Sequence, residues 1–170
     1  MREVTTKNFG LLIAFVLPGF VLLWGIAPYS TTISGWIGNT TGNLPTVGGF
    51  LYVTLASVGL GQLVSTLRWL VIDTLHHRTG VRPAHFDFGR LRNSIDAYDR
   101  LIEIHYRYYQ WHANGLVAVT LASLMHWVAR GFRFGEFTLI VLIDLLLYLG
   151  SRDTLSKYYR RVDDLVRRDF

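Results

Sequence analysis

Two long apolar runs limit what this chain can fold into more than any other feature. The first, residues 9–29 (FGLLIAFVLPGFVLLWGIAPY), has no charged side chain, and the second, residues 48–72, has only Arg68 near its end. Each run has about 21 residues or more, enough for a helix to cross a hydrocarbon core of roughly 30 Å. The chain is 51% hydrophobic and its mean hydropathy is positive. We therefore predict an integral membrane protein.

A secretory signal peptide is the competing interpretation of the first run, because Gly25-Ile26-Ala27 resembles a cleavage site. Pro28 would follow the cut, and the run is long, so we expect a retained membrane helix. Two shorter apolar segments, residues 113–129 and 137–150, flank a compact turn. We predict an all-α membrane domain over 1–170 with four transmembrane helices. The alternative is that the last two segments form a short re-entrant hairpin.

The positions of the basic residues predict the topology. Of the 17 Lys and Arg residues, only Arg130 and Arg133 fall on one side of a four-span arrangement, and all the others fall on the opposite side. An excess of Lys and Arg marks the cytoplasmic side of a membrane protein. We therefore expect a protein of the bacterial inner membrane with both termini in the cytoplasm. The net charge of +5 is then a topology signal, and we expect no nucleic-acid partner.

A polar segment separates the second and third spans. Within it, apolar residues recur at steps of three and four, and oppositely charged residues such as Asp96 and Arg100 stand four apart. We predict a cytoplasmic amphipathic helix over 87–110 and a basic helical tail over 151–170. The apolar seam of the first helix could face lipid headgroups, a second copy or a cytoplasmic partner, and we expect burial against protein. The seam consists of Phe88, Leu91, Ile95, Tyr98 and Ile102.

Small and polar side chains share one face of the second span. A water-filled pore exposes such groups, so this face could line a channel in a homo-oligomer. Small residues also allow two helices to approach closely, so the same face could be a contact between helices. The sequence leaves both interpretations open. The residues are Thr54, Ser57, Gly61, Ser65 and Arg68, with Gln62 beside them.

Three ionisable residues lie within the predicted spans: Arg68, His126 and Asp144. A carboxylate in the middle of a membrane helix costs roughly 2.5–3.5 kcal/mol on insertion scales, so Asp144 needs a protein or water partner. Arg68 lies at a similar predicted depth, and we predict that the two pair, within a chain or across an interface. His126 is the rival partner. A proton or ion path is the functional alternative to a structural pair.

Signals of enzymatic chemistry are weak. Arg100 with His105, and Arg107 with His112, match the loose Arg-x(4–6)-His spacing of HEPN ribonucleases. Such matches arise by chance in a chain with many Arg residues and six His. A histidine group over 76–85 lacks a carboxylate at ligand spacing, and the chain has no cysteine. We expect no enzyme, no metal and no cofactor.

Three stretches carry a resemblance: LPGFVLLWG (17–25), PTVGGFLYVTLAS (45–57) and HYRYYQ (105–110). Through them the chain resembles small four-span membrane subunits of phage-defence loci, including CRISPR-associated and Kiwa-type ones. The resemblance implies a homo-oligomer that disturbs or senses the membrane, and it transfers no functional residue. We expect an oligomeric pore or membrane effector. The alternatives are a non-conducting scaffold that recruits a cytoplasmic partner and, third, a ribonuclease at the membrane surface.

Overall fold

The computed structural model of the chain describes residues 10, 12–38, 47–83 and 95–168. Every element in these ranges is helical, which confirms the all-α prediction at this level. η1, η3 and η5 are π-helical turns and η2 is a 3₁₀ turn. The elements are η1 (Leu12–Val16), α2 (Leu17–Ile26), η2 (Ala27–Tyr29), α3 (Thr31–Ile37), α4 (Val47–Arg68), η3 (Trp69–Asp73), α5 (Thr74–Arg78), α6 (Ile95–Leu101), η5 (Ile102–Tyr106), α7 (Arg107–Arg130) and α8 (Phe134–Arg168).

Three stretches of helix in the described part of the chain are long and apolar enough to cross a membrane. They are Leu12–Tyr29, Val47–Arg78 and Phe134–Arg167. The first covers most of the apolar run 9–29, the second includes the run 48–72, and the third includes the predicted fourth span. The predicted third span, 113–129, lies in α7, which is long enough but has no 18-residue stretch as apolar as those of the other three. The lower hydropathy of α7 follows from its position in the fold.

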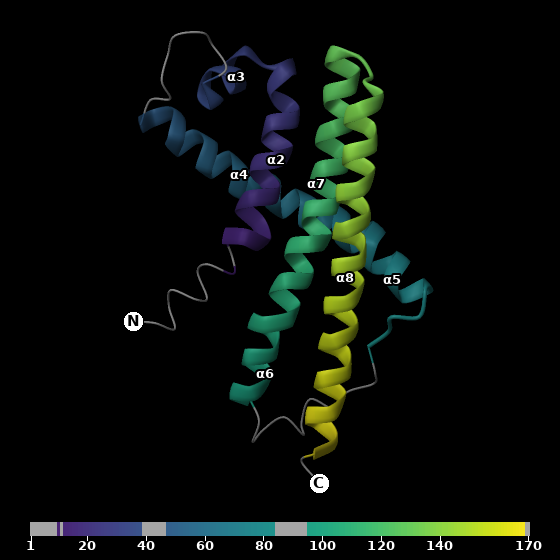
Figure 1. The fold of residues 1–170 in the computed structure, drawn as a ribbon. Helices are drawn as coiled ribbons and strands as arrows, with labels where there is room; N and C mark the ends of the chain where they lie inside the picture. Colours follow the sequence, from purple (N-terminus) through teal and green to yellow (C-terminus); the bar gives the residue numbers. More distant parts are fainter. Residues whose placement is uncertain (1–9, 11, 39–46, 84–94, 169–170) are drawn as a thin grey trace.

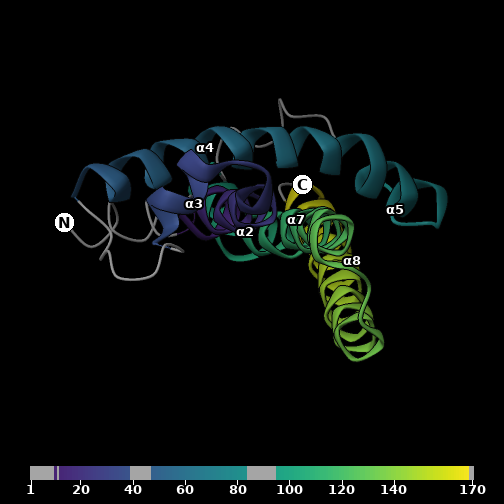
Figure 2. The ribbon, with the colours of Figure 1, turned by 90° about the horizontal axis from the view of Figure 1, so that it is seen from above.

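The helices form two layers. α2, α7 and α8 stand side by side, and α4 passes obliquely across one face of them (Figure 1). The view from above shows α4 and α5 along one side of this row (Figure 2). α7 is the central member, since it packs against α2, α4 and α8. A central helix turns less of its surface toward lipid, so it can carry more polar side chains than its neighbours.

Glycines allow α2 and α4 to cross at close range. A Cβ atom on Gly19 would lie 1.8 Å from the carbonyl oxygen of Ser57, and one on Gly61 would lie 2.1 Å from that of Phe15. Neither position can hold a larger residue unless the backbones separate. A third contact of this kind joins α2 to α7, where a Cβ on Gly25 would lie 2.5 Å from the Cα of Ala122. Small residues therefore set the spacing of these helices.

α7 and α8 form one long antiparallel hairpin. The helix runs from Ile95 through α6 and η5 into α7 and ends at Arg130, and α8 returns over 35 residues. The described part of the predicted amphipathic helix over 87–110 is helical and continues into α7 without a break. Residues 87–94 of that prediction lie outside the described ranges. The predicted helical tail is the continuation of α8.

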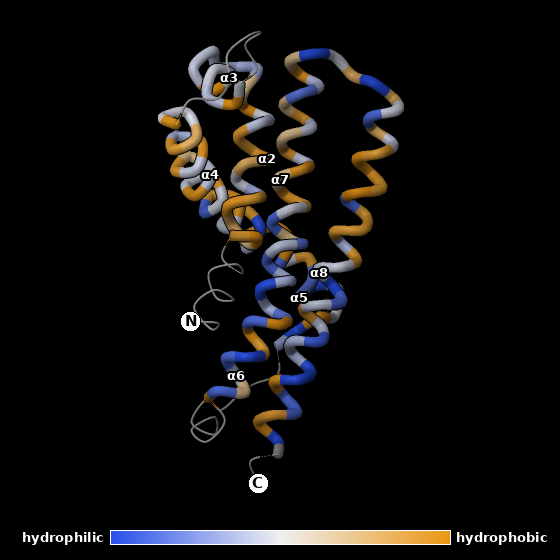
Figure 3. The backbone as a smooth tube through the Cα atoms, turned by 60° about the vertical axis from the view of Figure 1, so that its left-hand side comes forward, coloured by the Kyte–Doolittle hydropathy of each residue, from blue (hydrophilic) through white to orange (hydrophobic). Residues whose placement is uncertain are grey.

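Hydropathy divides this hairpin into two halves (Figure 3). The half near the α7–α8 turn is mostly apolar along α8, and the half toward α6 and the C-terminus alternates polar and apolar residues. We call the polar half, residues 95–109 and 151–167, the stalk. Its two helices are joined by a hydrogen bond between two tyrosines: the hydroxyl oxygens of Tyr98 and Tyr158 lie 3.1 Å apart. Tyr106 packs against both Tyr109 and Tyr158.

Candidate functional site

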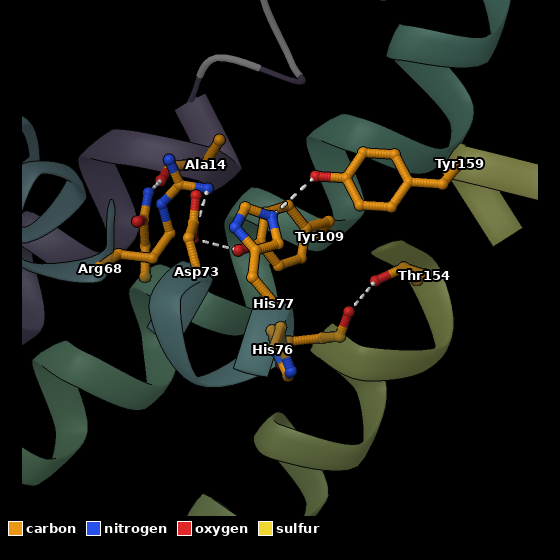
Figure 4. Close-up of polar contacts among 10 residues, drawn as sticks. Ala14, Arg68, Asp73, His76, His77, Tyr109, Thr154 and Tyr159 are labelled. Atoms are coloured by element: carbon orange, nitrogen blue, oxygen red, sulfur yellow. Dashed lines mark hydrogen bonds and ion pairs between the residues drawn. The ribbon is translucent and has the colours of Figure 1, made fainter. Parts of the chain in front are cut away.

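A cluster of buried polar side chains lies where the end of α4 meets α7 and α8 (Figure 4). We call it the polar junction and define it as Arg68, Asp73, His76, Tyr109 and Ser151. Most of these side chains are hidden from solvent: Arg68 is only 5% exposed, and His76, Tyr109 and Ser151 are fully buried. Asp73 is partly buried. The junction sits between the apolar half of the hairpin and the stalk, so it marks the boundary of the two.

The π-helical turn η3 brings Arg68 and Asp73 together. In an α-helix, side chains five positions apart point about 140° away from each other. A π-helical turn pairs residues five apart, so it rotates Asp73 back toward Arg68. The Nη1 of Arg68 lies 3.6 Å from the Oδ1 of Asp73, and their side chains are 6% and 14% exposed. The result is a buried ion pair within one helix.

Tyr109 connects this pair to α7. Its hydroxyl group donates a hydrogen bond to the Oδ1 of Asp73, and its ring centroid lies 5.2 Å from the Cζ of Arg68. Burial and the bond to the carboxylate raise the pKa of Tyr109 well above its usual range. Tyr109 therefore stays protonated and remains a donor to Asp73. It serves both members of the ion pair, through its hydroxyl group and through the face of its ring.

His76 connects the same segment to α8. Its Nε2 lies 2.9 Å from the Oγ of Ser151, and that Oγ donates to the carbonyl oxygen of Tyr148 at 2.8 Å. The Ser151 oxygen therefore accepts from His76, which assigns the proton of a neutral His76 to Nε2. Tyr148 stacks on the imidazole, with ring centroids 5.2 Å apart. The Nδ1 of His76 is buried and has no hydrogen-bond partner in the described structure.

The segment after α5 is tied to α8 at the edge of the junction. Arg152 donates from Nη1 to the Oγ1 of Thr79 at 2.6 Å and from Nη2 to its carbonyl oxygen at 2.8 Å. His77 lies 3.2 Å from the hydroxyl oxygen of Tyr159 and accepts from Arg82 through its carbonyl oxygen. These contacts fix the chain where it leaves α5. Figure 4 shows His77 facing Tyr159 across this edge.

The structure places the polar face of the second span largely inside the chain. Ser57, Gly61 and Arg68 are buried, and Ser57 and Gly61 lie against α2. Thr54 and Ser65 are partly buried. Within one chain this face is thus a contact between helices, which is the alternative to a pore lining. Gln62 is exposed.

The three predicted buried charges are not brought together. Arg68 pairs with Asp73, whereas the Oδ2 of Asp144 accepts from the Oγ1 of Thr120 at 2.9 Å. The predicted pairing of Arg68 with Asp144 is therefore wrong within a chain, because η3 supplies Arg68 with a nearer carboxylate. A pairing across an interface stays a prediction. His126 stacks on Trp24 with ring centroids 3.8 Å apart.

The apolar seam of the predicted surface helix is partly described. Phe88 and Leu91 lie outside the described residues, and Ile95 is 57% exposed. Tyr98 and Ile102 pack against a cluster of buried side chains formed by α7 and α8. Within a chain, part of the seam thus holds the stalk together, and burial of Ile95 against another protein stays a prediction.

The described structure gives little support to chemistry at the histidines. Arg107 donates to the Oε1 of Gln110 at 3.3 Å, and the Nδ1 of His112 lies 2.7 Å from the carbonyl oxygen of Tyr108. Arg107 and His112, one of the two Arg-x(4)-His pairs, therefore bond to other residues and not to each other. No group of three His, Asp or Glu side chains in the described residues could hold a metal ion. The expectation that the chain is not an enzyme stays a prediction.

Sequence reasoning missed most of the polar junction. Asp73, His76, Tyr109 and Ser151 carry no motif, and each falls at the margin of an apolar run. The available signal was the combination of a carboxylate and a histidine just after a span that ends in arginine. Asn114 was missed too: it is buried in α7, and its Nδ2 donates to the carbonyl oxygen of Ala14 at 2.6 Å. That bond satisfies a carbonyl at the π-helical turn η1.

No family model, curated protein or solved structure matches this chain.

Proposed function

We propose that this chain is a four-span scaffold of the bacterial inner membrane that presents its stalk to a cytoplasmic protein. One observation carries the proposal: α7 and α8 continue without a break from an apolar half into a polar half that is held together by its own aromatic contacts. Such a hairpin projects a rigid two-helix surface from the bilayer. On the polar face of α4, which could have lined a pore, Ser57 and Gly61 instead pack against α2.

The four-span topology is part of this proposal. α7 and α8 are joined by the three residues 131–133, so if α8 crosses the bilayer α7 crosses beside it. The polar groups of α7 point to neighbours: Asn114 to η1 and Thr120 to Asp144. Large apolar side chains on α8 are exposed, among them Leu142 and Leu146, as lipid-facing residues would be. The basic stalk then lies in the cytoplasm.

The topology can be tested by labelling, because the chain has no cysteine. Single cysteines at Phe132, in the α7–α8 turn, and at Ser156, in the stalk, would be treated with a membrane-impermeant maleimide. We expect Phe132→Cys to react in intact spheroplasts and Ser156→Cys to react only after the membrane is opened. Equal labelling of both in intact cells would contradict the topology.

The scaffold role is tested by crosslinking within cells. Ile104 is 54% exposed on the stalk, and Leu146 is 69% exposed on the apolar half of α8. A photoreactive amino acid at Ile104 should yield a discrete crosslink to a cytoplasmic protein, whereas the same group at Leu146 should not. Crosslinks from Ile104 only to a second copy of the chain would contradict the scaffold role and favour an oligomer.

A second candidate is an oligomeric membrane pore or effector, and Asp144 favours it. The Oδ1 of Asp144 is buried without a hydrogen-bond partner in the described structure, on a helix otherwise rich in exposed leucines. A free carboxylate oxygen in such a span could meet a second chain or an ion. Single-channel currents in planar bilayers that disappear in Asp144→Asn would support this candidate over the scaffold. A role in phage defence stays a prediction.

A further inference from the structure

A cleft opens beside the polar junction, between the segment after α5 and the stalk part of α8. Its volume is about 600 Å³. Three arginines line it: Arg82 from the segment after α5, and Arg152 and Arg160 from α8. Guanidinium groups from two chain segments therefore meet in this cleft.

The arginines keep donors for a ligand. Arg152 uses two of its N–H groups on Thr79, and Arg82 uses its Nε on the carbonyl oxygen of His77. A guanidinium has five N–H donors, so each retains at least three, and Arg160 has no hydrogen bond or ion pair within the described residues. None of the three is paired with a carboxylate in that part of the chain.

Two carboxylates also line the cleft, and each forms an ion pair with a basic side chain. Asp153 pairs with Lys157 at 2.6 Å, and Asp163 pairs with Arg167 at 3.0 Å. Neither of these cations lines the cleft. The charge left for a ligand is therefore positive, and a guanidinium recognises a phosphate through parallel N–H donors.

The position of the cleft indicates what bears that phosphate. Leu149 lines the cleft, and one and two helical turns before it Leu145 and Leu142 lie on the same face of α8. These leucines are 51%, 51% and 54% exposed, in the order Leu149, Leu145, Leu142. An exposed apolar track thus leads directly into a cationic cleft. A molecule that fits both parts has a phosphate head and a hydrocarbon chain.

We propose that this cleft binds the headgroup of an anionic phospholipid, with an acyl chain along the leucine face of α8. The proposal depends on the membrane integration proposed above. Basic pockets at the cytoplasmic ends of membrane helices suit such headgroups because the anionic leaflet presents them at that depth. The cleft lies on the α8 side of the stalk, and Ile104, the stalk position proposed for crosslinking to a protein partner, does not line it.

The test compares lipids retained by the purified protein. Wild type in detergent is mixed with equal amounts of dioleoyl phosphatidylglycerol and dioleoyl phosphatidylcholine, and native mass spectrometry measures the bound lipids. We expect the wild type to prefer phosphatidylglycerol. A basic residue near an anionic headgroup contributes a factor of about five, so Arg82→Gln with Arg160→Gln should weaken that preference about 25-fold.

A matched control removes the same charge elsewhere. Arg78 and Arg161 are exposed and do not line the cleft, so Arg78→Gln with Arg161→Gln should keep the preference. Ser156 lines the cleft and is exposed, so Ser156→Glu tests the site by an independent change and should also weaken the preference. Equal preference in the cleft variants, the control and the wild type would overturn the proposal.

Two further results separate the possible explanations. If glycerol 3-phosphate protects the wild type against thermal unfolding as well as phosphatidylglycerol does, the ligand is a free phosphate and the lipid assignment is wrong. Extraction of the wild type from membranes by alkaline carbonate would instead contradict the proposed function. Retention in carbonate without any lipid preference would overturn only the lipid site.

Discussion

The buried ion pair of Arg68 and Asp73 makes a quantitative prediction. In Asp73→Ala the Arg68 guanidinium, whose side chain is 6% exposed, loses its carboxylate, and the Tyr109 hydroxyl loses its acceptor. Removing one partner of a buried pair typically costs about 3–5 kcal/mol. We expect Asp73→Ala to lower the free energy of unfolding by about that amount. The measurement is denaturant unfolding in mixed micelles, followed by circular dichroism.

A second and a third variant identify the cause. The double variant Arg68→Met with Asp73→Leu removes both charges together, and replacing a buried pair by apolar residues is often neutral, so most of the lost stability should return. Asp153→Ala breaks the exposed pair with Lys157, whose side chains are 58% and 44% exposed, and should cost about 0.5 kcal/mol or less. An Asp73→Ala variant no less stable than Asp153→Ala would refute the reasoning, and so would a double variant as unstable as the single one.

Three other predictions follow from the same structure. Gly61→Ala places a Cβ 2.1 Å from a carbonyl oxygen of η1 and should separate η1 from α4, lowering the thermal midpoint in detergent. Gly59→Ala meets nothing within 4 Å and should leave the midpoint unchanged or raise it. Burial, with help from Arg161, lowers the pKa of His105 below 6.5. The unfolded chain then binds more protons as the pH falls through 6.5, so stability present above that pH is lost below it, and His105→Gln should flatten the dependence of the unfolding free energy on pH. The pure protein should not cleave a fluorescent RNA, and cleavage that disappears in His105→Ala or His112→Ala would contradict the non-enzyme prediction.

Much of the fold could be predicted because its signals are local. The two long apolar runs, 9–29 and 48–72, specify helices by length and hydropathy, and the structure has helices long and apolar enough to cross a membrane in both places. The step of three and four residues before the third span correctly indicated helix at Tyr98 and Ile102. The sequence could not predict that α8 of the same chain is the protein surface they pack against, since a surface helix and a helix that extends a span have the same period.

The candidate site was harder to predict because its residues do not meet at helical spacing. We predicted the pairing of Arg68 with Asp144 from their similar depths, counted along regular α-helices. The π-helical turn η3 changes which residues share a face, and its last residue, Asp73, accepts a hydrogen bond from Tyr109 of α7. The polar face of α4 was read correctly as a stripe, but only the approach of Gly19 to Ser57 decides that α2 occupies it within the chain.

By itself the sequence determined an all-helical chain with apolar segments long enough to cross a bilayer, because hydropathy and length are properties of each segment alone. Tertiary structure decided the central position of α7, whose modest hydropathy becomes understandable only once α2, α4 and α8 surround it. It also decided the partners of the buried polar groups: Asp73 for Arg68, Ser151 for His76 and Thr120 for Asp144. A buried polar group takes the nearest donor or acceptor that the packed backbone presents, and that distance is set by how helices cross, not by spacing along the chain.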